Sequence, residues 1–90
     1  MALLDLLGRR WALRVLWELR VDALTFRELQ ARCEGMSSSV LNQRLRELRA
    51  AEIVVLRDRA GYQLTPEGQA LLAALMPLHD WAVRWSERSR

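Results

Sequence analysis

Residues 25–51 read TFRELQARCEGMSSSVLNQRLRELRAA, and this stretch decides the fold. Its first four residues, Thr25 to Glu28, fit a capping box, in which a threonine hydroxyl accepts from the backbone amide three residues on and a glutamate reaches back. A helix begins there and ends before Gly35. Ser37 is an N-cap candidate for a second helix, which runs to about Ala51. Two helices joined by so tight a turn predict a helix-turn-helix.

The helix from Ser37 to Ala51 has one apolar and one polar face. At about 100° per residue, Leu41, Leu45 and Leu48 lie close together around its axis and are expected in the core. The opposite face carries hydroxyl, carboxamide and guanidinium groups, which can read the edges of DNA bases by paired hydrogen bonds. We expect base contacts from Ser38, Ser39, Asn42, Gln43 and Arg46. The alternative is a face that is only solvated, although such faces usually favour Glu and Lys.

After Glu52 the pattern changes to that of a β-hairpin. Ile53 to Leu56 is rich in β-branched residues, Asp58 to Gly61 supplies turn geometry, and Tyr62 to Leu64 returns. We interpret this hairpin as a wing beside the preceding helix, able to touch phosphates. The expected phosphate contacts are Thr25, Arg27, Arg44, Arg57 and Arg59. Arg44 lies nearest the apolar stripe, so we expect its stem to cover core side chains while its head reaches a carboxylate or a phosphate.

Apolar helices are expected at both ends of the chain. Four leucines between residues 3 and 7 form a short helix that stops at Gly8, and a second helix runs from Arg10 to about Val21. The last helix opens at Thr65-Pro66-Glu67, with threonine as N-cap and proline in the first turn. It reaches about Glu87, with a kink expected at Pro77.

The two terminal helices predict a homodimer. From Leu71 to Trp85, apolar residues recur at steps of four, three, four and three, which is the spacing of a coiled-coil seam. So apolar a helix needs cover from a second chain as well as from its own core. The expected interface residues are Leu3, Leu4, Leu7, Leu71, Leu75, Leu78, Trp81, Ala82 and Trp85. His79 is expected to be an ordinary interface residue rather than a ligand or a pH switch.

Composition favours a nucleic acid as the partner. Ninety residues are the size of one domain, so we expect residues 1–90 to form a single domain, and 51% hydrophobic residues favour a folded chain. All 14 cationic side chains are arginine, the net charge is +3 and the isoelectric point is near 10.4. A basic balance of this kind points to nucleic acid. A codon bias toward arginine is the alternative explanation for the missing lysine.

Several classes of function are not expected. With one histidine and one cysteine, the chain has too few of these residues to form a metal-binding cluster, and it has no glycine-rich phosphate loop. We therefore expect that the protein binds no metal and no cofactor and is not an enzyme. Cys33 falls on the apolar stripe of its helix and is expected to be a small buried hydrophobe rather than a redox sensor. No secretory signal or membrane span is evident, because the longest nearly apolar run covers only residues 70–78. We therefore expect a cytoplasmic location.

The order of elements is that of a winged helix-turn-helix, mainly α with a small β-hairpin, and the residues resemble the HxlR-type bacterial transcriptional regulators. The resemblance covers essentially the whole chain, and residues 41–48 are its most specific part. It rests on residues 4–11 (LDLLGRRW), 16–19 (LWEL), 26–29 (FREL), 35–37 (GMS), 40–48 (VLNQRLREL) and 64–68 (LTPEG), with Asp80-Trp81 beyond.

The resemblance implies a homodimeric regulator, expected to be a repressor, that binds an inverted repeat in double-stranded DNA. The dimer would be built from the first and last helices, with the helix from Ser37 in the major groove and the wing, about Ile53 to Leu64, beside it. Three features depart from the family pattern. Glu52 stands where the family usually has glycine, Ser38 replaces a usual proline, and the wing is short.

Two further points limit what the resemblance carries. Many members of the family sense oxidants or electrophiles through a cysteine ahead of the first helix, but Cys33 occupies a position that is usually apolar, so thiol sensing is not expected. The alternative function is a winged-helix protein-interaction module without DNA binding, since a fold alone does not fix a function. Such a module would show aromatic or aliphatic anchors on the exposed helix face, where this chain has Ser, Asn, Gln and Arg.

Overall fold

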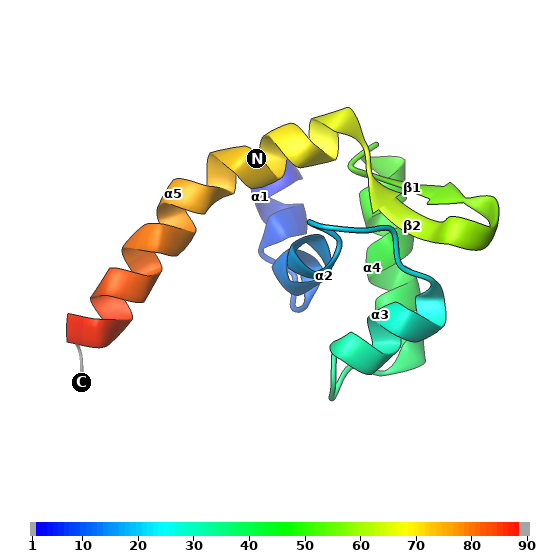
Figure 1. The fold of residues 1–90 in the computed structure, drawn as a ribbon, viewed down its shortest axis with the longest axis horizontal. Helices are drawn as coiled ribbons and strands as arrows, with labels where there is room; N and C mark the ends of the chain where they lie inside the picture. Colours follow the sequence, from blue (N-terminus) through cyan, green and yellow to red (C-terminus); the bar gives the residue numbers. More distant parts are fainter. Residues whose placement is uncertain (1, 89–90) are drawn as a thin grey trace.

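The computed structural model describes residues 2–88 as a mainly helical chain with one β-hairpin (Figure 1). The elements in chain order are α1 (Ala2–Leu7), α2 (Ala12–Glu18), α3 (Phe26–Arg32), α4 (Ser38–Ala50), β1 (Val54–Arg57), β2 (Gly61–Leu64) and α5 (Pro66–Arg88). A single 3-10 turn, Asp58–Ala60, joins the two strands. Helices α3 and α4 followed by the β1–β2 hairpin are a helix-turn-helix with a wing, so the predicted fold class is confirmed.

Three helices begin where the sequence predicts, because each has a side-chain cap. Thr25 Oγ1 accepts a hydrogen bond from the Glu28 amide at 3.2 Å, and the Glu28 carboxylate accepts one from the Thr25 amide at 2.9 Å, which completes the capping box of α3. At the start of α4, Ser37 Oγ accepts from the backbone amide three residues on, at 3.2 Å. Thr65 Oγ1 does the same for α5 at 3.0 Å.

Helix α2 is shorter than the predicted helix from Arg10 to Val21. Trp11 has a left-handed backbone conformation (φ 78°), which residues other than glycine rarely adopt, so the helix starts only at Ala12. At its other end it stops at Glu18. Leu13 is 47% exposed and faces the side of α2 toward α5.

The core lies where α2, α3 and α4 meet. Leu41, Leu45 and Leu48 are at most 1% exposed, as predicted, and they pack with Val15, Leu16 and Leu29. Cys33 is fully buried among them, and this burial raises the pKa of its thiol above the ordinary value, against the opposing charge of Arg14. The prediction that Cys33 is a buried apolar residue is therefore confirmed.

The β1–β2 hairpin is tied to the segment before α3. Its strands are antiparallel, and the pairing ends with Arg57 opposite Gly61. Leu24 forms an isolated bridge with Tyr62, with N–H···O distances of 2.9 and 2.7 Å in the two directions. A Cβ atom at Gly61 would lie 2.3 Å from the Leu24 carbonyl oxygen, and the φ of Gly61 is 94°, so only glycine fits there.

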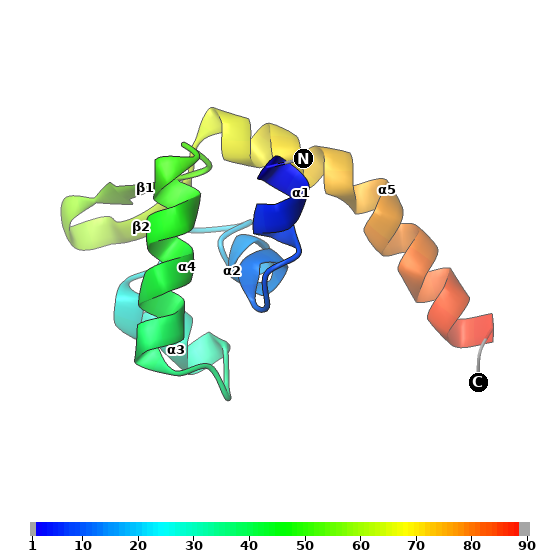
Figure 2. The ribbon, with the colours of Figure 1, turned by 180° about the vertical axis from the view of Figure 1, so that it is seen from behind.

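Helix α5 starts against the hairpin and ends away from the body of the protein. A Cβ atom at Gly68 would lie 2.1 Å from the Ile53 carbonyl oxygen, so the first turn packs closely on the chain that enters β1. The second half of α5 projects away from the other elements in both views (Figures 1 and 2). Pro77 lies inside the helix, which bends as predicted because proline removes one backbone donor. Within residues 2–88 no helix is long and apolar enough to span a membrane.

Candidate nucleic-acid interface

Helix α4 presents a polar outer face that no other element covers. Figure 2 shows α4 at the front of the molecule, with α3 and the hairpin to its side and behind it. Each predicted base-contact residue is exposed: Ser38, Ser39, Asn42, Gln43 and Arg46. Ser39 Oγ lies 3.2 Å from Ser37 Oγ. Within the described part of the chain, the side chains of Asn42, Gln43 and Arg46 have no hydrogen-bond partner. Their donors and acceptors are therefore available for a ligand outside the chain.

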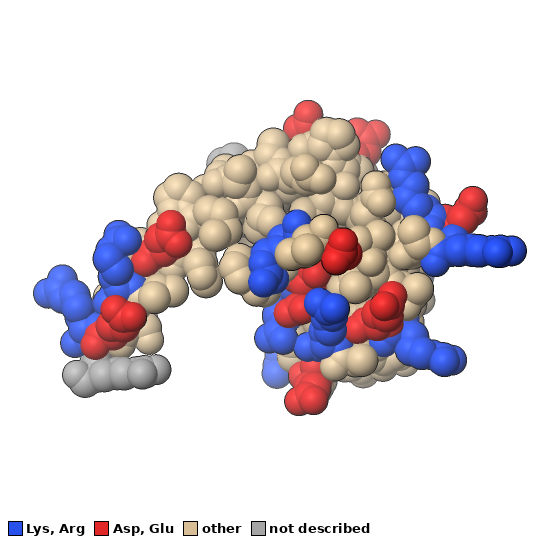
Figure 3. Space-filling view, viewed as in Figure 1, with Lys and Arg blue, Asp and Glu red and all other residues tan. Residues whose placement is uncertain are grey.

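The arginines of the chain divide into two groups by their partners. Four of them, Arg9, Arg14, Arg32 and Arg44, form salt bridges to Glu18 or Glu47. Five other exposed arginines of α3, α4 and the hairpin have no ion pair among residues 2–88, and these are Arg27, Arg46, Arg49, Arg57 and Arg59. Figure 3 shows cationic side chains projecting into solvent at the hairpin end of the molecule, with acidic groups beside them. This second group can pair with an external anion without breaking an internal bond.

Arg44 does not belong to that second group, and here the structure corrects the sequence analysis. Its side chain is only 12% exposed, its Nε donates to the Arg10 carbonyl oxygen at 2.9 Å, and its Nη1 donates to the Glu47 carboxylate. The sequence analysis expected the Arg44 guanidinium to reach a carboxylate or a phosphate, and in the structure it reaches a carboxylate. We therefore leave Arg44 out of the candidate phosphate contacts.

Two of the predicted phosphate contacts, Thr25 and Arg27, lie at the start of α3. Thr25 is half-buried and its hydroxyl oxygen already accepts one hydrogen bond, but the hydroxyl can still donate to an anion. The hydrogen bonds from the Thr25 backbone and side chain lower the pKa of Glu28, so this carboxylate is ionised at neutral pH. The predicted phosphate contacts of Thr25, Arg27, Arg57 and Arg59 remain predictions, and the exposure of the three arginines is compatible with them.

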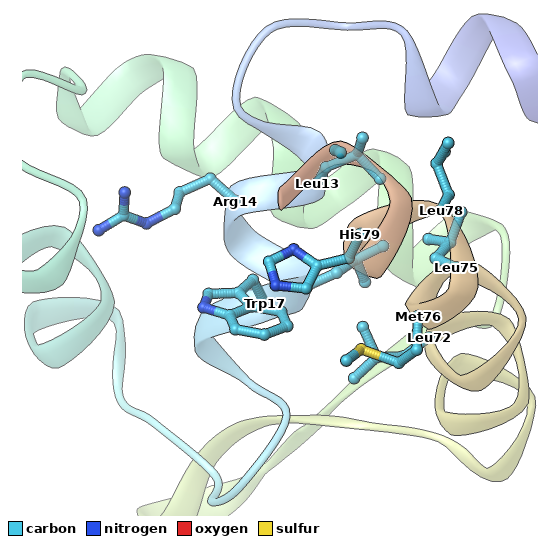
Figure 4. A pocket seen from close by; sticks show the side chains of 10 residues that line it. Leu13, Arg14, Trp17, Leu72, Leu75, Met76, Leu78 and His79 are labelled. Carbon is cyan, nitrogen blue, oxygen red and sulfur yellow. The ribbon is translucent and has the colours of Figure 1, made fainter. Parts of the chain in front are cut away.

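An apolar groove of about 400 Å³ separates α2 from α5 (Figure 4). Its lining includes Leu13, Leu75 and Leu78. Trp17 and His79 also line it, and their rings stack with centroids 4.8 Å apart. The guanidinium carbon of Arg20 lies 3.9 Å from the Trp17 ring centroid. The sequence analysis did not predict the stacking of Trp17 on His79, because these two residues are 62 positions apart in the sequence.

The predicted interface residues fall into two sets. Leu3, Leu4, Leu78, Trp81 and Trp85 are between 41% and 61% exposed, and the rings of Trp81 and Trp85 stack with centroids 6.1 Å apart. Ala82 is exposed and Leu75 is half-buried, and both line the groove. Leu7 and Leu71, in contrast, are half-buried against the core of the same chain, so part of their cover is internal. A contact with a second chain remains a prediction for all of them.

Comparison with known proteins gives consistent results. A family model described as HxlR-like helix-turn-helix matches residues 6–90. The HTH-type transcriptional regulator YvaP of Bacillus subtilis (strain 168) is 35% identical over 92 aligned positions, which cover 94% of this chain and 84% of that protein. The crystal structure of quinone-bound YodB from B. subtilis aligns with a TM-score of 0.85 at 31% identity and covers 92% of both chains. The crystal structure of a possible HxlR family transcriptional factor from Thermoplasma volcanium aligns with a TM-score of 0.84 at 25% identity. The alignment covers 94% of this chain and 82% of the Thermoplasma chain.

Proposed function

Because the chain belongs to the HxlR-like helix-turn-helix family, whose fold implies DNA binding, we propose that it is a homodimeric repressor that binds an inverted-repeat operator. Helix α4 enters the major groove and the β1–β2 hairpin lies on the adjacent backbone. The observation that carries the proposal is the outer face of α4, where carboxamide and guanidinium groups are exposed without side-chain hydrogen-bond partners in the described chain.

Base reading and phosphate binding fall to different residues. Asn42, Gln43 and Arg46 lie on the outer face of α4 with Ser38 and Ser39, and carboxamides and guanidinium groups make paired hydrogen bonds to base edges. Three of the remaining unpaired arginines, Arg27 at the start of α3 and Arg57 and Arg59 on the wing, neutralise backbone phosphates together with the Thr25 hydroxyl. These phosphate contacts position the protein but carry no sequence information.

The dimer is formed by α1 and α5. The supporting feature is the exposed apolar surface on both helices, since Leu4, Leu78 and Trp85 are each about 60% exposed and exposed apolar surface of this extent marks an interaction site. A two-fold dimer presents two copies of α4 to one face of the duplex, so the half-sites lie about one helical turn, roughly 34 Å, apart or a multiple of it.

A pair of arginine variants tests the assignment of roles. The operator is first obtained by selection from random duplex DNA, and affinities are then measured over a range of salt concentrations. Arg46→Ala is expected to cost about 1–3 kcal/mol per half-site and to relax the preference at one base position. Arg59→Ala is expected to weaken all duplexes alike and to lower the slope of log K against log salt by about 0.9 per half-site.

The control for these variants is Arg84→Ala, which removes an exposed arginine on α5 without touching α4 or the wing. It is expected to change neither the base preference nor the salt slope. If Arg46→Ala and Arg59→Ala have equal effects on operator and random DNA, the assignment of roles is wrong. If the wild-type chain binds no duplex and instead captures a protein through the face of α4, the winged-helix interaction module is the better description.

A further inference from the structure

The corner between α1 and α2 is held against the middle of α4. Arg9 Nε lies 3.2 Å from Glu47 Oε2, and Glu47 also accepts from Arg44. Arg44 in turn donates from Nε to the backbone carbonyl of Arg10 at 2.9 Å. One carboxylate and one largely covered guanidinium on α4 therefore bind two consecutive residues of the corner, Arg9 and Arg10.

The same corner also reaches the turn of the helix-turn-helix. Trp11 has a φ of 78° and its indole is half-buried against the core, while the guanidinium carbon of Arg10 lies 5.5 Å from its ring centroid. A Cβ atom at Gly35, in the turn between α3 and α4, would lie 4.0 Å from Cη2 of Trp11. The corner thus touches α4 at its middle and the turn before α4, which are two separated points on the DNA-reading unit.

Of the two α4 residues that make this connection, Arg44 is turned away from the proposed DNA face and Glu47 lies at its edge, about 40° from Gln43. Around the axis of α4, Glu47 lies about 100° and Arg44 about 160° from Arg46. The side chains of Glu47 and Arg44 are 23% and 12% exposed, whereas Arg46 is exposed. Their positions suit a contact inside the protein.

We propose that Glu47 and Arg44 are positioning residues that fix the angle between the recognition helix α4 and the dimerisation helix α1. This inference rests on the proposed function, in which α1 lies at the dimer interface and α4 in the major groove. Helix α1 ends at Leu7, only two residues before Arg9, which Glu47 binds. The contacts of Glu47 and Arg44 with Arg9 and Arg10 therefore fix the orientation of α4 relative to α1, and so relative to the dimer interface.

The consequence is a strict spacing between the half-sites. Adding one base pair between them rotates one half-site by about 34° and shifts it by about 3.4 Å relative to the other. A dimer whose recognition helices are held at fixed angles binds only one spacing well. A dimer with a loosened corner tolerates neighbouring spacings, while each half-site is still read by the same side chains.

The experiment measures this spacing profile. Operators with the selected half-sites and spacings changed by up to two base pairs are titrated with the wild-type chain, Glu47→Gln and Arg9→Gln. Glu47→Gln keeps the length of the side chain and Arg9→Gln shortens it. Both variants break the same ion pair, but they change the net charge in opposite directions. Arg9 is half exposed, so its replacement leaves the core intact. A duplex with one half-site and a sedimentation run on each variant report base reading and dimer formation separately.

The matched control is Glu18→Gln. Glu18 also binds two arginines, Arg14 at 2.8 Å and Arg32 at 3.8 Å, but it connects α2 to the end of α3 and does not contact α4. Its replacement therefore reproduces the general loss of an ion-pair network without releasing the recognition helix. We expect the spacing profile of this control to match that of the wild type.

For the wild type we expect about a tenfold preference for the best spacing over its neighbours, and for both corner variants a preference below about threefold, with an unchanged base preference at the single half-site. Their overall affinities shift in opposite directions because of the opposite charge changes. An unchanged profile in both corner variants, or an equal flattening by Glu18→Gln, overturns the inference and leaves the proposed function intact. A wild-type chain that is monomeric or shows no preferred spacing overturns the proposed function, and the inference with it.

Discussion

Replacing Glu52 by glycine should stabilise the protein, although it removes a side chain. Glu52 follows the C-cap of α4 and has a φ of 61°, in the left-handed region. This conformation brings Cβ close to a carbonyl oxygen and costs a residue other than glycine about 1–2 kcal/mol. The backbone contacts at this corner do not need the side chain, because the Glu52 amide donates to the Arg49 carbonyl at 3.0 Å and its own carbonyl accepts from Thr65 Oγ1 at 2.6 Å.

The expected gain is smaller than this strain. Glycine has more conformational freedom to lose on folding, which offsets about 0.5–1 kcal/mol. The net stabilisation of Glu52→Gly is therefore about 0.5–1 kcal/mol, which corresponds to a rise in Tm of about 2–8 °C for a domain of this size. The rise is measured by thermal unfolding at a fixed protein concentration, because the Tm of a dimer depends on concentration.

Two variants separate the backbone effect from other effects. Glu52→Gln removes the charge and leaves the backbone preference unchanged, so it should move Tm very little. Ala51→Gly places glycine one position earlier, where φ is an ordinary −85°, and should lower the stability by about 0.5–1 kcal/mol. If Glu52→Gly lowers Tm as Ala51→Gly does, or if Glu52→Gln raises it equally, strain at this corner is not the cause.

Three other predictions follow from single contacts. Leu78→Glu, at a position that is 58% exposed, should convert the proposed dimer to a folded monomer in ultracentrifugation, and a dimer that persists in this variant would contradict the proposed α5 interface. Cys33, buried and with a raised thiol pKa, should react with a maleimide only as fast as the chain unfolds, whereas rapid labelling of the native protein at pH 7 would show that it is accessible. The folded-state pKa of Glu28 is lowered, so the contribution of this carboxylate to stability is present above the ordinary carboxyl pKa and is lost as pH falls through the lowered value. The Tm difference between wild type and Glu28→Gln should therefore shrink below about pH 4. A Tm difference that does not depend on pH would refute this prediction.

The parts of the fold that the sequence predicts are those decided by nearby residues. The caps at Thr25, Ser37 and Thr65 involve groups three residues apart, so a local pattern is sufficient to find them. The apolar stripe of α4 is equally local, since helix geometry alone brings its three leucines together.

The parts that the sequence does not predict depend on contacts between distant segments. Arg44 reaches the carbonyl of Arg10, 34 residues away, and no periodicity indicates that acceptor. Trp11 is left-handed in a segment that reads as continuous helix, and its indole is packed near the turn at Gly35. The stacking of Trp17 on His79 likewise appears only when α5 lies along α2. Tertiary packing outweighs local preference at each of these positions.

The absence of lysine has a structural explanation at some positions and not at others, and lysine replacements distinguish them. Arg14 and Arg44 each bind a carboxylate and a backbone carbonyl of another segment from separate nitrogens, a geometry that the single ammonium of lysine does not provide. Arg44→Lys should therefore cost about 1–3 kcal/mol in the free energy of unfolding, since its side chain is largely covered and a charged hydrogen bond is lost. Arg59, exposed and without an ion pair in the described chain, needs only its charge for a phosphate, so Arg59→Lys should keep both the stability and the salt slope of DNA binding. Equal losses from both replacements would mean that the wing arginine makes a planar contact of its own, and a harmless Arg44→Lys would leave codon bias as the sufficient explanation at that position.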